Sequence, residues 1–325
     1  MTAEGQVAEE VRYVHASDGT RLSATILRPE GRCRGVFLLV HGFSQNRKAF
    51  LQGHLPWTLA RAGFTAIVGE LRGHGRSDRP SKWSVEDHLL RDLPSLRKLA
   101  EVMGEGRPVH YLGHSMGGVL GFASLAEGLG WASVTGLAAP LELGRGSPLV
   151  GAAARLVTPL VWLAGDRRVP MDRFLAALSG FLAWPSAPLP VRAVQRLLAL
   201  ANPNAADPIA IREVLRSSDP ESMEVFRAFL RSARGLETRA SARTGGASAA
   251  KPLEVRVRGA TIPLAAVVGG LDIFAPPPSV RLLLTGKHAG PRRVVSLPRA
   301  SHVDLTVGED VARTVEGLIP FLEPS

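Results

Sequence analysis

The residues best suited to chemistry lie in the stretch Gly113-His114-Ser115-Met116-Gly117. A short β-type run over residues 109–112 precedes this stretch, and an apolar, helix-like pattern follows it. A G-x-S-x-G sequence between a strand and a helix is typical of a sharp turn that exposes a nucleophilic serine. Glycines are expected on both sides because a side chain there would collide with neighbouring backbone. We therefore interpret Ser115 as a candidate nucleophile, with a glycine-rich turn and an ordinary capping serine as the alternative.

A serine hydroxyl is nearly inert at neutral pH, so Ser115 needs a base. His302 lies in the loop after the last expected strand, and we interpret it as that base. His41 and His114 lie beside the candidate nucleophile and are expected to shape turns rather than to act as bases. His74 lies in a glycine-rich loop and is expected to structure that loop.

The base needs a carboxylate to orient it, and three candidates are present. Asp272 directly follows a buried strand that precedes His302, so it is the first choice. Asp304 is the nearest rival, but its position two residues after His302 favours a role in capping or bracing the loop. Glu142 is a distant third. The order Ser115, Asp272, His302 is the order in which one common serine-hydrolase architecture uses these groups.

Attack by a serine on a carbonyl carbon creates an oxyanion, which backbone amides can stabilise. The Met116 amide would stand at the N-terminus of the helix that follows Ser115. A second donor is expected from His41-Gly42-Phe43, after the strand over residues 35–40. Gly42 would let this backbone approach closely, which makes the Phe43 amide the best candidate.

The surrounding pattern predicts strands that alternate with helices, which is typical of a mostly parallel α/β sheet covered on both faces. Ligands bind at the carboxyl ends of the strands in such sheets, and every candidate above follows a strand. Strands are expected over residues 11–15, 21–27, 35–40, 64–68, 109–112, 132–138, 262–268 and 293–297. Helices are expected over residues 47–62, 84–104 (with Ser84 as N-cap), 116–129, 278–285 and 309–322.

The alternation stops over residues 141–252, which contain no convincing strand. Leucine, alanine and arginine at helical spacing predict four or five helices there, and residues 236–251 are expected to form a flexible surface stretch. We therefore predict a core of residues 1–140 and 253–325 with a helical cap insertion of residues 141–252.

Composition limits the partners of the chain. Its 39 basic and 29 acidic residues give a net charge of +10, but the basic residues are scattered, so we expect no nucleic-acid partner. The single cysteine, Cys33, excludes an intrachain disulfide. No uncharged apolar run is long enough to cross a membrane, and residues 1–10 do not resemble a secretory signal, so we expect a cytoplasmic protein. We expect no cofactor and no metal, and the oligomeric state stays open.

Five groups of residues together resemble the α/β-hydrolase superfamily, over residues 11–140 and 261–321. They are His41-Gly42-Phe43, Leu71-Arg72-Gly73-His74-Gly75-Arg76-Ser77, Gly113-His114-Ser115-Met116-Gly117-Gly118, Leu271-Asp272 and Ser301-His302. The resemblance extends to the esterase, monoacylglycerol-lipase and lipase-like branches, in which a helical cap covers the site. Polyhydroxyalkanoate synthases carry cysteine in place of Ser115, and haloalkane dehalogenases and most epoxide hydrolases carry aspartate, so Ser115 argues against these activities.

The resemblance implies a serine hydrolase that cleaves carboxylic esters, with a small-molecule ester as its substrate. A cap rich in leucine, phenylalanine and tryptophan favours an apolar acyl or alcohol group, although most of these side chains are expected to pack the cap on the core. The same three residues could also act on a thioester, an amide or a C–C bond, or in perhydrolysis. A non-catalytic binding module is the remaining alternative.

Overall fold

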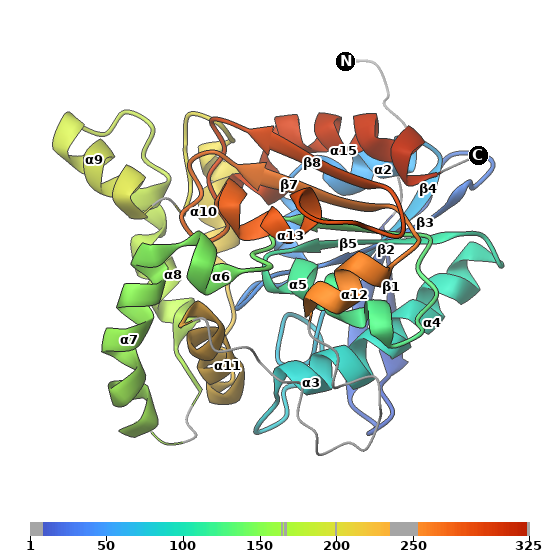
Figure 1. Ribbon diagram of the computed structural model, residues 1–325, viewed down its shortest axis with the longest axis horizontal. Coiled ribbons are helices and arrows are strands. Elements are labelled where there is room, and N and C mark those ends of the chain that lie inside the picture. The colour runs from blue at the N-terminus through green and yellow to red at the C-terminus, as the bar shows by residue number, and fades with distance from the viewer. Residues whose placement is uncertain (1–8, 164, 166–167, 199, 235–252, 324–325) are drawn as a thin grey trace.

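The computed structural model describes residues 9–163, 165, 168–198, 200–234 and 253–323 (Figure 1). In this part of the chain, eight strands form one sheet in the order β1-β2-β4-β3-β5-β6-β7-β8. β1 pairs antiparallel with β2, and β2 pairs antiparallel with β4, whereas the remaining pairs are parallel. The strands are β1 (Glu9–His15), β2 (Arg21–Leu27), β3 (Gly35–Val40), β4 (Phe64–Gly69), β5 (Val109–His114), β6 (Ser133–Leu137), β7 (Leu264–Gly269) and β8 (Arg292–Leu297).

All eight expected strands are present, with ends that differ from the prediction by at most two residues. Every residue of β3, β4, β5, β6 and β7 is buried, which explains why these strands are nearly continuous apolar runs. β8 lies at the edge of the sheet and is partly exposed. The mostly parallel, doubly covered sheet is confirmed.

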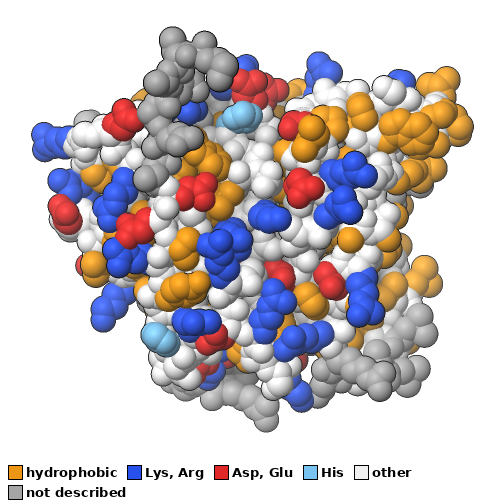
Figure 2. All heavy atoms as spheres, turned by 180° about the vertical axis from the view of Figure 1, so that it is seen from behind, with side chains coloured by type: hydrophobic (Ala, Val, Ile, Leu, Met, Phe, Trp, Pro, Cys, Tyr) orange, Lys and Arg blue, Asp and Glu red, His pale blue; other side chains and the backbone are white. Residues whose placement is uncertain are grey.

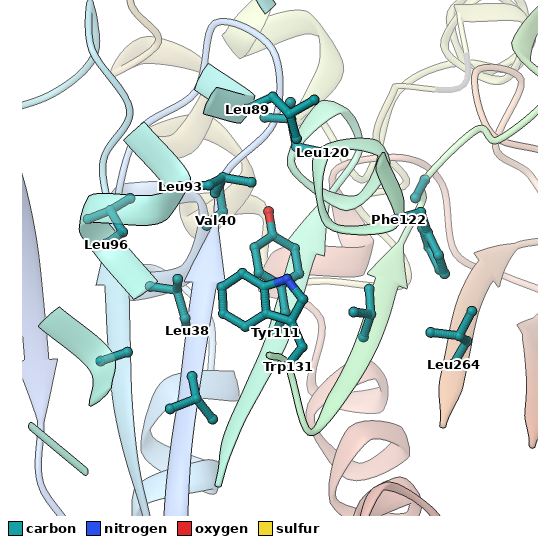
Figure 3. Packing of buried hydrophobic residues seen from close by; sticks show 14 of the residues in the cluster. Leu38, Val40, Leu89, Leu93, Leu96, Tyr111, Leu120, Phe122, Trp131 and Leu264 are labelled. Carbon is teal, nitrogen blue, oxygen red and sulfur yellow. The ribbon is translucent and has the colours of Figure 1, made fainter. Parts of the chain in front are cut away.

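Helices pack on both faces of this sheet (Figure 1). On one face, α4 (Leu93–Gly104) and α5 (Met116–Ala123) cover β3 and β5, and Figure 3 shows Tyr111 and Trp131 at the centre of this layer. On the other face lie α2 (Leu55–Arg61) and α15 (Glu309–Leu322), which bury a second apolar cluster. These helices cover the two faces of the sheet, and the parallel strands end in loops at its carboxyl edge.

The prediction of one continuous helix over residues 47–62 was wrong. Residues 47–62 form two short helices, α1 (Lys48–Leu51) and α2, with a break at Gly53. A Cβ on Gly53 would lie 2.4 Å from the carbonyl oxygen of Thr306, in the short helix α14 (Asp304–Val307). The chain breaks there because a distant segment packs directly on its backbone.

Other helices differ from the prediction in detail. The stretch 84–104 begins at Ser84, which accepts a hydrogen bond from the Asp87 amide as the expected N-cap. It then runs as α3 (Val85–Asp87), a π-helical turn (His88–Asp92) and α4. α5 ends at Ala123 and continues as a 3-10 turn (Ser124–Ala126). The helix expected over 278–285 is a 3-10 turn (Pro277–Val280) followed by α13 (Arg281–Leu284), and α12 (Leu253–Gly259) and α14 were not expected.

The segment between β6 and β7 is helical, and its helices gather at the left of Figure 1. They are α6 (Leu143–Gly146), α7 (Pro148–Leu163), α8 (Met171–Leu182), α9 (Leu189–Leu198), α10 (Pro208–Arg216) and α11 (Met223–Ala233). Five of these have nine or more residues, in agreement with the expected four or five. The boundaries at residues 141 and 252 stay a prediction, and the surface stretch expected over 236–251 lies outside the described residues, as do residues 1–8.

The surface mixes charges and carries apolar side chains over the cap. On the face seen in Figure 2, basic side chains lie among acidic ones, and hydrophobic side chains gather at the right-hand edge. Exposed apolar residues of the cap include Leu156, Phe174 and Leu189. None of the helices in the described part of the chain combines the length and the apolar character that crossing a bilayer requires.

Candidate active site

Ser115 lies between β5 and α5 in a strained backbone conformation, with φ 50° and ψ −118°. A Cβ on Gly113 would lie 2.4 Å from the carbonyl carbon and oxygen of Gly117. A Cβ on Gly117 would lie 2.3 Å from the Val40 carbonyl oxygen. The Tyr111 hydroxyl donates to the Gly117 carbonyl at 2.6 Å and fixes the start of α5. Both glycines are therefore required by contact with backbone, and the turn holds the Ser115 side chain away from the helix.

The three residues proposed for catalysis form one hydrogen-bonded series. His302 Nε2 lies 3.0 Å from Ser115 Oγ, and His302 Nδ1 lies 2.8 Å from Asp272 Oδ2. The amides of Phe274 and Ala275 donate to Asp272 Oδ1 at 2.8 and 3.0 Å, so the buried carboxylate is held on both oxygens. When Nδ1–H donates to Asp272, the lone pair of Nε2 faces the serine hydroxyl, which is the tautomer a base requires.

Asp272 and His302 come from loops at the carboxyl ends of two neighbouring strands. Asp272 follows β7, and His302 follows β8. A Cβ on Gly269 would lie 2.4 Å from the Ala300 carbonyl oxygen, and one on Gly270 would lie 2.6 Å from that of Pro298. The two loops therefore pack backbone on backbone, which places Asp272 within reach of the His302 ring.

The rival carboxylates have other partners. Asp304 accepts the Ser301 amide at 2.7 Å and the Asn202 amide at 3.0 and 3.1 Å, and so braces the His302 loop against the cap. Burial raises the pKa of Asp304 to about 7, although these two amides oppose the shift. Glu142 pairs with Arg281 at 3.3 Å. Among the described carboxylates, Asp272 is the one that hydrogen-bonds the His302 ring.

The two backbone amides expected to act as oxyanion donors are those of Phe43 and Met116. Gly42 approaches the nucleophile so closely that a Cβ there would lie 3.0 Å from Ser115 Cβ. The Gly42 amide donates to Gln45 Oε1 at 3.0 Å, and the Ser44 amide donates to Glu221 Oε2 at 3.0 Å. Neither the Phe43 amide between them nor the Met116 amide, the first of α5, donates a hydrogen bond to a described residue outside its own element.

The two histidines next to the site tie its loops together. His41 donates from Nδ1 to the Gly42 carbonyl at 2.9 Å and accepts the Leu71 amide on Nε2 at 3.1 Å. His114 lies between Gln45 Oε1 at 2.7 Å and the His302 carbonyl oxygen at 3.0 Å. Burial, together with neighbouring histidines, lowers the pKa of both rings well below the usual value, so each is neutral. A neutral His114 carries one N–H, so only one of these two oxygens accepts a hydrogen bond from it. These contacts fit the turn-shaping roles expected from the sequence.

Sequence reasoning missed Asp219 and Glu221, which reach the site loops from the cap. Asp219 pairs with Arg79 at 2.6 Å, and fully buried Glu221 contacts His74 at 3.3 Å. In the sequence, both residues stand in Asp219-Pro220-Glu221-Ser222, which is a typical loop before a helix. Nothing in that pattern indicates that both carboxylates point into the core. Among the described residues, no cluster of three or more histidine, cysteine or acidic side chains is arranged to hold a metal ion.

Known proteins with similar sequences are hydrolases. The family model described as serine aminopeptidase, S33, matches residues 31–305. A curated relative, triacylglycerol lipase 2 of Arabidopsis thaliana, is 29% identical over 181 residues. That match covers 48% of this chain and 40% of the relative, so the chain corresponds to about two fifths of the relative's length.

Solved structures share the fold at low sequence identity. The enol-lactonase of Burkholderia xenovorans is 19% identical with a TM-score of 0.59, and the match covers 96% of this chain and 99% of that one. The monoacylglycerol lipase of Paleococcus ferrophilus is 17% identical with a TM-score of 0.59, and the match covers 93% and 98%. The chain therefore belongs to the serine aminopeptidase S33 family, within the α/β-hydrolase superfamily.

Proposed function

We propose that this hydrolase cleaves carboxylic esters of small molecules through an acyl-enzyme. The observation that carries the proposal is the hydrogen-bonded series from Ser115 Oγ to His302 Nε2 at 3.0 Å and from His302 Nδ1 to Asp272 at 2.8 Å. Ser115 is the nucleophile, His302 the general base and acid, and Asp272 the carboxylate that holds the imidazole in the correct tautomer.

The reaction has two halves that use the same groups. Ser115 Oγ attacks the acyl carbon while His302 Nε2 takes its proton, and the resulting imidazolium then protonates the leaving alcohol. Water attacks the acyl-enzyme with His302 again as base, which releases the acid and restores the serine. The amides of Phe43 and Met116 receive the oxyanion in both halves, and loss of one such donor costs about 3 kcal/mol of transition-state stabilisation.

Residues 41–46, which follow β3 and carry the Phe43 amide, are here called the oxyanion loop. Aromatic side chains near this loop support an apolar acyl or alcohol group. The ring of Phe43 lies 6.0 Å from that of Phe226 and 5.7 Å from that of Phe229, both on cap helix α11. The ring of Phe274 lies 5.3 Å from that of His302. The four phenylalanine rings are only partly buried, so they offer apolar surface near the loops that carry Phe43 and His302. Two of the similar proteins are named as lipases of acylglycerols, which favours the same substrate class.

The same three residues could act on an amide, and the family description, serine aminopeptidase, favours this as the second candidate. Thioester cleavage, C–C cleavage and perhydrolysis use the same nucleophile and base. A non-catalytic binding module would have no need of a serine, an imidazole and a carboxylate in hydrogen-bonding series, so we place it last.

We expect p-nitrophenyl esters to be hydrolysed, with kcat/KM rising from the acetate toward longer acyl chains because the chain gains apolar contacts. Phe229→Ala should lower kcat/KM for a long-chain ester by about tenfold more than for the acetate. Steady-state kinetics on a series of acyl lengths, with a thioester and an anilide of the same acyl group, measures this.

Phe174→Ala is the matched control, since Phe174 lies on cap helix α8 with 58% of its surface exposed. It should leave the acyl-length profile unchanged. Activity confined to the anilide would overturn ester hydrolysis, and an unchanged profile in Phe229→Ala would contradict the apolar acyl site.

A further inference from the structure

A cap segment enters the core beside the oxyanion loop. Residues 217–222, here called the cap strap, connect α10 to α11. The Asp219 amide donates to the Ser44 carbonyl at 2.8 Å, and the Ser44 hydroxyl donates in return to the Asp219 carbonyl. Asn46 Nδ2 donates to the Ser217 carbonyl at 2.6 Å. The strap is therefore bound to the loop that carries Phe43 by one main-chain hydrogen bond and by two that side chains of this loop donate.

Glu221 of this strap is fully buried and accepts four hydrogen bonds. Its Oε2 accepts the Ser44 amide at 3.0 Å and His74 Nε2 at 3.3 Å. Its Oε1 accepts Trp83 Nε1 and the Ser222 amide, both at 2.9 Å. A buried carboxylate is costly unless it is paired and saturated with donors, and here each oxygen has two.

His74 completes the pair as an imidazolium. Its Nδ1 faces the Arg72 carbonyl at 2.9 Å, and its Nε2 faces Glu221, so both nitrogens face acceptors and both need a proton. Burial opposes the charge, but Glu221, Asp219 and the Arg72 carbonyl together outweigh burial and raise the pKa of His74. Burial likewise opposes ionisation of Glu221, but His74, His88 and the Ser222 amide together lower its pKa to about 2. The pair is therefore ionised at neutral pH, with His41 and His88 also packed against the His74 ring.

This pair fixes one of the two peptide groups that flank the Phe43 amide. Ser44 has a positive φ of 59°, a conformation that L-residues adopt only when their surroundings hold it. Its N–H is bound to Glu221, and the Gly42 N–H is bound to Gln45, so Phe43 lies between two fixed peptide groups. The Ser44 N–H shares one planar peptide unit with the Phe43 carbonyl, and the Phe43 N–H belongs to the preceding unit. Rotation of the Ser44 peptide would change the backbone angles at Phe43 and with them the direction of the Phe43 N–H.

We propose that Glu221, held by protonated His74, is a positioning residue for the oxyanion loop and keeps the Phe43 amide aimed at the substrate oxygen. The inference rests on the proposed ester hydrolysis. Glu221 touches no reacting atom, so its effect passes through the Ser44 amide. The cap would then do more than cover the site, because its strap completes the site's geometry.

Glu221→Gln tests the proposal. A glutamine can direct its NH₂ to His74 and its oxygen to Trp83 and Ser222, but the Ser44 N–H then faces a donor. We expect kcat for the best p-nitrophenyl ester to fall about 10- to 100-fold with KM within about twofold, since misplacement of one group by about 1 Å costs up to about 10²-fold. Circular dichroism and thermal melting establish that the variant is folded at the assay temperature.

Asp219→Asn is the matched control. Asp219 is a buried carboxylate of the same strap, but its side chain binds Asn46, Gly75 and Arg79 rather than the Ser44 amide. Its substitution should lower Tm and leave kcat within about threefold. Equal losses of kcat in both variants would mean that the strap acts through stability alone, which would overturn a positioning role.

Glu221→Asp replaces Glu221→Gln if the latter does not fold. Aspartate keeps the negative charge beside His74, but its side chain is one methylene shorter, which draws the carboxylate away from the Ser44 amide. The proposal predicts a several-fold fall in kcat at unchanged KM. An unchanged kcat in a folded Glu221→Gln, or in Glu221→Asp in its place, overturns the inference while leaving ester hydrolysis intact. Wild-type protein that hydrolyses no ester overturns the proposed function instead.

Discussion

Replacing His302 by alanine is expected to lower kcat for ester hydrolysis by about a millionfold, the loss typical when a serine hydrolase is deprived of its base. His302 Nε2 is the acceptor 3.0 Å from Ser115 Oγ, so without it the hydroxyl keeps its proton and the leaving alcohol receives none. Stopped-flow and steady-state assays with an activated ester measure the loss of kcat. The rate that remains measures the contribution of the oxyanion donors without the base.

His15→Ala is the control for this experiment because His15 is an exposed residue at the end of edge strand β1. Its kcat should equal that of the wild type. Activity of His302→Ala within about tenfold of the wild type, in preparations shown to be free of wild-type enzyme, would remove His302 from the proposed mechanism.

Asp272→Asn is expected to lower kcat by about 10⁴-fold. An asparagine in this place donates its amide N–H to Nδ1, which moves the imidazole proton to Nε2 and directs it at Ser115 Oγ. The amides of Phe274 and Ala275 still bond the asparagine oxygen, so the fold should persist. The measurement is kcat at saturating ester, alongside a melting curve.

Asp304→Asn is the matched variant, since Asp304 and Asp272 are both 2% exposed and lie in neighbouring loops. Asp304 bonds the Ser301 and Asn202 amides rather than the His302 ring. Its substitution should lower Tm and leave kcat within about tenfold. The opposite result, with Asp304→Asn inactive and Asp272→Asn active, would transfer the carboxylate role to Asp304.

Much of the sheet and of the candidate site could be predicted from the sequence, because the apolar pattern of each strand agrees with its place in the sheet. Buried parallel strands are continuous apolar runs, so their ends were predictable within two residues. Parallel strands present their carboxyl ends at one edge of a sheet. Ser115, Asp272 and His302 each follow such an end, and the structure brings them into hydrogen-bonding range.

The predictions failed where a distant segment decides local structure. The helix expected over 47–62 breaks at Gly53 because α14 packs on that backbone, and residue 306 is far away in the sequence. The π-helical turn at His88–Asp92 lies where Asp92 binds both His88 and buried Arg72, the latter from another loop. Periodicity within one window contains no information about such partners.

The cap was the least predictable part for the same reason. Its helices could be expected from composition, but their packing against the core depends on single contacts. Glu221 is one of these: it is a loop carboxylate in the sequence and a saturated, fully buried group in the structure. The placement of Phe226 and Phe229 against Phe43 is another, and it determines the surface offered to the substrate.

The central claim is that Ser115 is an activated nucleophile, and labelling with a fluorophosphonate probe tests it most directly. The probe reacts covalently with serines whose hydroxyl is activated by a base. Intact mass and peptide mapping of wild-type protein should show one adduct, on Ser115, and Ser115→Ala should show none. Absence of an adduct on the wild type, or undiminished labelling of folded Ser115→Ala, would contradict the account.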